Sequence, residues 1–271
     1  MDIKLEKMIA QGNTAEVYSL PDNKILKLFR NGMPRGAIER EYQNGLYVQK
    51  VLNCVPKVYE MIEVDGRFGI VYQEIKGKDM LKIMISSSWK LNRYARRFAH
   101  YHLHIQKQIE DGLCTLKEKL IEDIRNVELL NDEKKEMMID YLMGLPEGNA
   151  LCHFDFHPGN IMIDDNEAII LDWMTACQGD SCADVARTCI MLKYGGVEHA
   201  PWIVKRIISL FQKHICKIYL KEYLRISKRE IGDITKWELP VAAARLREWI
   251  ADSEKSELMK LVNDRCEELS K

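Results

Sequence analysis

The sequence predicts an α+β fold with a small β-rich N-terminal part, residues 1–75, and a larger, mostly helical part, residues 76–271. Three observations predict it. Short β-prone runs separated by turn residues fill the first part. Apolar residues recur at helical spacing through most of the second part. A further pair of β-prone runs interrupts the helices between residues 161 and 171. At 271 residues the chain can form one large domain or two lobes.

Bulk composition excludes several classes of protein. Lys and Arg number 40 against 41 Asp and Glu, so the chain lacks the basic excess typical of nucleic-acid-binding proteins. No stretch is long and apolar enough to cross a bilayer. Residues 1–7 are charged and lack the apolar core of a signal peptide. We therefore expect a cytoplasmic protein with no nucleic-acid and no membrane partner.

The eight cysteines include no Cys-x-x-Cys pair. Cys177, Cys182 and Cys189 lie close in sequence, but their spacing matches no usual zinc pattern. We interpret them as small apolar side chains in a reducing compartment.

Two hairpins are predicted in the first part. Residues 15–20 and 24–29 are strands around the turn 21–23, and Lys27 lies in the second of them. Residues 57–64 and 67–74 are strands around Asp65-Gly66, a strong hairpin signal. Between the hairpins, Pro34 suits the first turn of a helix that carries Glu41.

Helices are expected over most of the second part. Helical spacing of apolar residues covers residues 89–108, 116–126, 132–143, 201–223 and 240–250. His102 lies on the apolar stripe of the first of these helices, so we interpret it as a packing residue. Asp180 and Asp184 suit the start of another helix. The polar tail from Ser253 is expected to form a peripheral helix.

The stretch from His153 to Trp173 carries the strongest chemical pattern. Folding its two β-prone runs symmetrically about Asp165-Asn166-Glu167 places Asn160 opposite Asp172. Opposed residues have Cβ atoms about 4.5–5.5 Å apart, which suits two oxygen ligands of one Mg²⁺ ion. Asp155 precedes this pair in a segment that Pro158 and Gly159 keep irregular, where its carboxylate can accept a proton from a hydroxyl.

His153-x-Asp155-x-x-x-x-Asn160, followed by Asp172 after a returning strand, is the catalytic-loop and metal pattern of kinase-type phosphoryl transfer. Together with the run His157-Pro158-Gly159-Asn160, it resembles the aminoglycoside phosphotransferase and choline kinase-like family. Asp172-Trp173 stands where protein kinases have Asp-Phe-Gly, which favours the small-molecule kinases.

The resemblance implies a two-lobed, protein-kinase-like fold that uses ATP or GTP with Mg²⁺. It implies that the turn before the first strand, with Gly12 and Thr14, covers the phosphates and that Val17 lies beside the nucleotide. It further implies that Glu41 pairs with Lys27, Glu39 being the rival partner. The carbonyl of Gln73 and the amide of Ile75 would face the base, and Asp184 would brace the catalytic loop.

The acceptor is expected to be a hydroxyl of a small molecule, bound near Trp173 and the C-terminal helices. Candidate contacts there are Trp237, Arg245, Glu248 and Trp249. Residues 180–271 contain 14 Asp and Glu against 17 Lys and Arg, so this region is not acidic overall. We therefore favour a neutral, zwitterionic or singly charged acceptor over a polycationic aminoglycoside. The alternatives are a protein kinase-like enzyme, a catalytically silent nucleotide-binding regulator, and a purely structural acidic hairpin.

Overall fold

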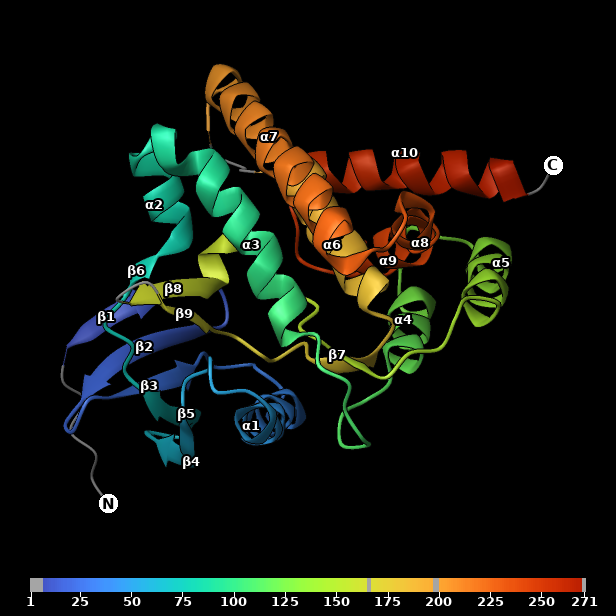
Figure 1. The fold of residues 1–271 in the computed structure, drawn as a ribbon. Helices are drawn as coiled ribbons and strands as arrows, with labels where there is room; N and C mark the ends of the chain where they lie inside the picture. The colour runs from blue at the N-terminus through green and yellow to red at the C-terminus, as the bar shows by residue number, and fades with distance from the viewer. Residues whose placement is uncertain (1–6, 165–166, 197–199, 270–271) are drawn as a thin grey trace. The chain divides into compact units, whose positions relative to one another are not determined.

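The computed structural model describes residues 7–164, 167–196 and 200–269. The chain forms two compact units (Figure 1). Unit 1 comprises Met1–Ile83 and Pro158–Ala176, and unit 2 comprises Met84–His157 and Cys177–Lys271. The lobe boundary predicted at residue 75 is a different division of the chain and stays a prediction. The units follow packing, and they group residues 158–176, which contain the predicted metal hairpin, with the N-terminal sheet.

Unit 1 is built on a five-stranded antiparallel sheet of order β1-β2-β3-β5-β4. The strands are β1 Met8–Gln11, β2 Ala15–Leu20, β3 Lys24–Phe29, β4 Val58–Val64 and β5 Arg67–Gln73. Helix α1, Arg35–Val51, packs on one face, where Ile38 joins a core cluster with Phe29 and Ile70. Strands β2 to β5 confirm the two hairpins that the sequence predicts. Strand β1 was not predicted, and all four of its residues are exposed.

A smaller sheet completes unit 1. Strand β8, Ile161–Asp164, pairs with β9, Glu167–Ile170, and with the short β6, Lys78–Asp79. The hairpin was predicted and is present, although its turn residues Asp165 and Asn166 lie outside the described residues. The β6 strand gave no sequence signal, because two residues are too short to show alternation.

Unit 2 is mostly helical. Its helices, including α2 at the boundary with unit 1, are α2 Met80–Ser86, α3 Leu91–Ile105, α4 Leu116–Arg125, α5 Asp132–Met143, α6 Ser181–Tyr194, α7 Trp202–Ser227, α8 Ile231–Thr235, α9 Glu238–Arg245 and α10 Asp252–Leu269. Helix α6 is central, since every residue from Cys182 to Leu192 is buried. Helix α7 packs against both α3 and α6 (Figure 1).

The helix starts follow capping chemistry. Thr115 forms a capping box with Glu118 at α4, and the side chains of Asn131 and Asp180 accept backbone N–H bonds at α5 and α6. The predicted helix at residues 240–250 instead runs from Glu238 to Arg245. Two short strands of unit 2, β7 Ala150–Cys152 and β10 Cys177–Gly179, were not predicted. Among the described residues, no helix is long and apolar enough to cross a membrane.

Candidate active site

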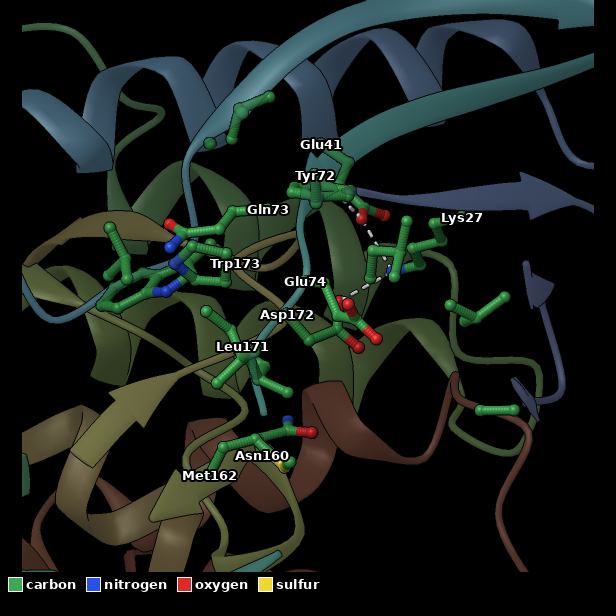
Figure 2. A pocket seen from close by; sticks show the side chains of 18 of the residues that line it. Lys27, Glu41, Tyr72, Gln73, Glu74, Asn160, Met162, Leu171, Asp172 and Trp173 are labelled. Carbon is green, nitrogen blue, oxygen red and sulfur yellow. Dashed lines mark hydrogen bonds and ion pairs between the residues drawn. The ribbon is translucent and has the colours of Figure 1, made fainter. Parts of the chain in front are cut away.

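Unit 1 contains a cavity of about 380 Å³. Most of its lining is apolar, with Val17 of β2, Ile25 of β3 and Met162 of β8 among the contributing residues. Polar side chains enter it from β3, α1, and the segment just after β9 (Figure 2). A mostly apolar cavity with a few convergent polar groups is the usual form of a small-molecule site.

Lys27 stands at the polar part of this cavity. Its Nζ lies 2.7 Å from Oε1 of Glu41 and 3.1 Å from Oδ1 of Asp172. The hydroxyl of Tyr72 donates a 3.0 Å hydrogen bond to the same Oε1 of Glu41. Figure 2 shows these four side chains pointing toward one another. The predicted Lys27–Glu41 pair is therefore present, and the rival Glu39 pairs with Arg35 instead.

Strand alternation explains why Lys27 faces the cavity. Leu26 and Leu28 point to the opposite face, where they form a core cluster with Val71. Lys27 is paired with Val17 across the β2–β3 ladder, and cross-strand partners share a face. Glu41 reaches the same place from α1, where it is buried with only 2% of its side chain exposed.

Burial and mutual charge set the ionisation of this group. Burial alone would lower the pKa of Lys27, but the carboxylates of Asp172 and Glu41 outweigh it and raise that pKa. Burial raises the pKa of Glu41, and Lys27 offsets part of that rise. Burial, followed by the charge of Glu41, raises the pKa of the Tyr72 hydroxyl well above its usual range. Lys27 is therefore held charged as the shared partner of two carboxylates.

The hairpin register differs from the prediction by one residue. Asp164 pairs with Glu167 and Ile161 with Ile170, and the N–H of Leu171 donates to the carbonyl of Asn160 at 2.8 Å. Asn160 therefore lies opposite Leu171, and the predicted Asn160–Asp172 opposition is wrong. The reason is that the connection has two residues rather than the three assumed. Asp165 and Asn166, which form it, lie outside the described residues.

Asp172 nevertheless lines the same cavity as Asn160. A one-residue slip in a regular strand would turn a side chain to the other face. Here β9 ends at Ile170, and Asp172 adopts a left-handed backbone with φ of 61°. Aspartate adopts a left-handed backbone more readily than most residues, and at this position the change of backbone direction ends the strand alternation. Its carboxylate and the amide oxygen of Asn160 are hard donors of the kind that Mg²⁺ prefers, and Asp172 already accepts a cationic partner in Lys27, so these residues fit a magnesium site.

Asn44 on α1 was missed by the sequence analysis. It is buried, and its Nδ2 lies 3.2 Å from the carbonyl of Trp173 and 3.1 Å from that of Met174. Trp173 also donates from Nε1 to the carbonyl of Ile170 at 3.0 Å. These bonds fix the chain directly after Asp172. A helix asparagine three residues from Glu41 carries no motif, so no sequence signal could have found it.

The other predicted nucleotide contacts divide into two groups. Val17, Gln73 and Ile75 line the cavity. Gly12 and Thr14 are absent from the described lining, and β1 contributes Ile9 and Ala10 in their place. The Gly12 turn is instead closed on itself, because its N–H donates to the carbonyl of Ala15 at 2.8 Å.

Asp155 lies in unit 2, on a loop held by Asp184. The carboxylate of Asp184 accepts the backbone N–H groups of His153 at 2.8 Å and Phe154 at 2.9 Å. His102 Nε2 donates to the same carboxylate at 2.9 Å, and His102 Nδ1 lies 2.6 Å from the hydroxyl of Tyr219. The predicted bracing by Asp184 is confirmed. His102 packs as predicted, but its hydrogen bonds make it a second support of the loop.

This support is electrostatically strong because it is fully buried. Burial alone would raise the pKa of Asp184, but His102 and then His153 outweigh it and lower that pKa. The loop it holds is strained, since Phe154 has φ of 59°. The Asp155 side chain is 30% exposed and lies 3.8 Å from His157 Nε2. The loop therefore presents a partly accessible carboxylate on a rigid base.

Arg187 on α6 is a second residue that the sequence analysis missed. Its guanidinium is buried and lies 4.8 Å from the ring centroid of Phe154, the neighbour of Asp155. It also pairs with Glu248 at 2.7 Å. Arg187 is three residues after Asp184, so both lie on one face of the helix. That spacing was the available signal.

The predicted acceptor contacts do not form one group. Arg245 pairs with Glu248 at 2.8 Å and with Glu254 at 2.6 Å, so both predicted residues belong to the ion network that includes Arg187. Trp237 is fully buried and Trp249 is 95% exposed. Trp173 lines the cavity of unit 1. The geometry therefore gives no support to Trp237 or Trp249 as acceptor contacts.

Within the described ranges, no three or more His, Cys, Asp or Glu side chains are grouped to hold a metal ion. Cys177, Cys182 and Cys189 are free and buried.

Comparisons with known proteins identify the family. The model of the phosphotransferase enzyme family matches residues 7–207. Similar solved structures include the streptomycin–ATP–APH(2")-IIa ternary complex, with a TM-score of 0.58 and 18% identity over 90% of this chain and 85% of that one. Choline kinase from Cryptosporidium parvum Iowa II has a TM-score of 0.57 and 11% identity, over 97% of this chain and 89% of that one. Macrolide 2'-phosphotransferase MphH from Brachybacterium faecium has a TM-score of 0.52 and 17% identity, over 90% of this chain and 86% of that one.

At these identities the structural likeness shows a shared fold, the protein-kinase-like α+β fold. A comparison with curated proteins gives no match. Because the family model matches well over half of the 271 residues, the chain belongs to the phosphotransferase enzyme family.

Proposed function

We propose that this protein is a small-molecule kinase that transfers the γ-phosphoryl group of ATP or GTP to a hydroxyl of a small metabolite or antibiotic. The observation that carries the proposal is the arrangement in unit 1, where Lys27 is held between Glu41 and Asp172 beside an apolar cavity. An apolar cavity suits a nucleotide base, and a fixed ammonium suits its phosphate oxygens. In the proposed division, residues 1–75 form the nucleotide-binding lobe and residues 76–271 carry the catalytic loop and acceptor site.

Each residue has a defined part in nucleotide binding. Lys27 contacts phosphate oxygens, and Glu41 keeps its ammonium in place. Val17 and Ile75 contact the base, and Gln73 lies beside it. Asn160 and Asp172 would hold Mg²⁺, which when bound neutralises charge on the phosphates.

Asp155 orients the acceptor hydroxyl and takes its proton. The acceptor oxygen forms a bond to the γ-phosphorus, and the bond from that phosphorus to the β,γ-bridging oxygen breaks. The nucleoside diphosphate leaves, and the carboxylate of Asp155 holds the released proton until solvent removes it. Most of the rate enhancement in such reactions comes from positioning and charge stabilisation. Asp184, His102 and Arg187 supply that positioning by fixing the loop.

The acceptor that we favour is neutral, zwitterionic or singly charged. The structure of unit 2 supports this choice, because Glu248 and Glu254 are already paired with Arg187 and Arg245 and so are less able to attract a polycation. The cytoplasm is the compartment that we propose, since it supplies nucleoside triphosphates and keeps thiols reduced, and Cys177, Cys182 and Cys189 are buried thiols.

A screen of hydroxyl compounds for acceptor-dependent release of ADP or GDP tests the proposal. It should include choline, thiamine, homoserine, sugars, macrolides and aminoglycosides, with ³¹P NMR to identify the product as a phosphate ester. Turnover with a small molecule is expected. Phosphorylation of protein substrates alone would favour the protein kinase-like alternative. Mg²⁺-dependent nucleotide binding without turnover on any acceptor would favour the silent regulator.

A further inference from the structure

The outer side of helix α7 exposes an unusual combination of side chains. Its first half carries large apolar residues in contact with solvent: Trp202 is 70% exposed, Ile203 54%, Ile207 61% and Leu210 62%. Ile203, Ile207 and Leu210 are spaced by four and three residues, so they form one stripe along the helix. We call this stripe, with Trp202 and the exposed cations beside it, the α7 face.

The packing of α3 explains why this stripe is uncovered. Asn92 at the start of α3 hydrogen-bonds His214 at 2.9 Å, and His100 lies 2.9 Å from Glu222 eight residues further along both helices. The two helices therefore run in the same direction, and α3 begins level with the middle of α7. The first turns of α7 extend past that start.

Charge on the α7 face is of one sign. From Trp202 to Lys221 the helix contains no Asp or Glu, and it contains five cations, which are Lys205, Arg206, Lys213, Lys217 and Lys221. Lys205 is two residues from both Ile203 and Ile207 and so lies on the opposite side of the helix, whereas the other four lie beside the stripe. All five are exposed. Among the described residues, no ion pair neutralises any of them. The next acid, Glu222, is already bonded to Arg225 and His100, which hold its pKa down to about 2.

The neighbouring helix extends the same field. No Asp or Glu occurs from Met84 to Ile109. Arg96 is exposed and lies one turn from both Asn92 and His100, the two residues that contact α7. The near-zero net charge of the whole chain hides this basic region, because acids gather elsewhere. Helix α10 alone contains Asp252, Glu254, Glu257, Asp264, Glu267 and Glu268.

The combination selects one kind of partner. A second copy of this chain bound face to face would bring its lysines against the same lysines. A nucleic acid would use the cations but gain little from exposed isoleucine and leucine. An anionic bilayer uses both, because apolar side chains and tryptophan enter the interface while lysines contact the head groups. We propose that the α7 face docks unit 2 on the surface of an anionic lipid bilayer, a partner that the composition of the whole chain did not predict.

Vesicle co-sedimentation tests the proposal directly. The full chain is mixed with phosphatidylcholine vesicles that contain phosphatidylglycerol, and in parallel with pure phosphatidylcholine vesicles. Binding is expected to the first and to be weak with the second. Lys213→Glu with Lys217→Glu should weaken binding about 30-fold or more. The matched control, Lys255→Glu with Lys260→Glu on α10, makes the same charge change and should bind like the parent.

A second pair of variants separates lipid insertion from simple charge attraction. Ile207→Ser and Leu210→Ser remove no charge and change exposed side chains, so folding should be retained. Each should weaken vesicle binding about tenfold, and the loss should persist at high salt. Equal binding by the α7 and α10 charge variants would overturn the proposal. If the chain binds duplex DNA and both serine variants bind it equally well, the face is a nucleic-acid site and the proposal is overturned. If sedimentation velocity shows a dimer that both serine variants abolish, the face is a dimer interface and the proposal is likewise overturned. None of these readouts depends on kinase activity.

Discussion

The Nζ atom of Lys27 lies 3.1 Å from Oδ1 of Asp172, the carboxylate that we propose as a metal ligand. The same ammonium lies 2.7 Å from Glu41 on α1. One cation therefore connects β3, α1 and the segment after β9. In the proposed function, the group that contacts phosphate and the group that holds the metal are in direct contact, so a change at one should alter the other.

The first prediction concerns the unit that Lys27 and Glu41 form. Lys27→Ala and Glu41→Ala should each lower kcat/KM for the nucleotide, and the double variant should lose less than the sum of the two free energies, because residues that act together are not additive. Steady-state kinetics of the four proteins measures the coupling. Glu39→Ala is the matched control and should resemble the parent, since Glu39 pairs with Arg35 on the surface. Full additivity would show that the pair does not act as a unit.

The second prediction concerns the metal. A ligand at about 100 times its Kd stabilises a protein by about 2.7 kcal/mol, which appears as a rise in Tm. ATP with Mg²⁺ should raise the Tm of the parent more than ATP alone does. In Asp172→Ala most of this additional rise should disappear. Asp164→Ala, an exposed aspartate in the same hairpin, is the control and should keep it. If Asp164 proves the more sensitive position, the assignment of Asp172 fails.

The third prediction concerns pH and the buried Asp184. Its folded-state pKa lies below the unfolded value of about 3.9. A carboxylate with a depressed pKa adds stability that is present above the unfolded pKa and is lost as pH falls through the folded pKa. Asp184→Ala should cost about 3–5 kcal/mol near neutral pH, because it leaves buried donors unpaired. Urea unfolding of both proteins should show this difference shrinking as pH drops below about 4. A difference that is constant across that range would contradict the ionic role.

Much of the fold could be predicted because its signals are local. Strands β2 and β3 match their predicted bounds, since each is a β-prone run closed by a turn at Pro21. The helix starts at Asn131 and Asp180 follow from capping side chains. What failed depends on contacts distant in sequence. Strands β7 and β10 are only three residues each, and they exist because each supplies the other's hydrogen bonds.

The candidate site divides in the same way. Motif spacing singled out Asn160 and Asp172, which line the cavity of unit 1. The same spacing singled out Asp155, whose role stays a prediction. The one-residue error in the hairpin register arose because turn length cannot be read reliably from Asp-Asn-Glu. Asn44 acts through contacts with backbone carbonyls that no spacing encodes. The position of Arg187 was marked only by its helical spacing from Asp184, and its contact with the Phe154 ring depends on the fold. The acceptor contacts were least predictable, since burial decides between Trp237 and Trp249, and burial is a property of the fold.

The fourth prediction concerns Arg187. Arg187→Lys keeps the charge but loses the planar guanidinium that lies against Phe154, so lysine should not replace arginine in supporting the loop. We expect kcat to fall about 10- to 100-fold with little change in nucleotide KM, because a small displacement of the loop misplaces Asp155. Arg225→Lys, in a surface pair with Glu222, is the control and should behave as the parent. A rise in nucleotide KM by the same factor as the fall in kcat would indicate a general structural defect instead.

The central claim is that Asp155 accepts the proton of the acceptor hydroxyl, and single-turnover kinetics of Asp155→Asn tests it most directly. Asparagine keeps the size of the side chain but cannot take the proton. General-base assistance is worth about 10²–10⁴-fold, so the rate of phosphoryl transfer should fall by that factor while nucleotide affinity barely changes. Asp140→Asn, an exposed aspartate on α5, is the matched control. Transfer within about threefold of the parent rate, far short of that general-base contribution, would contradict the account.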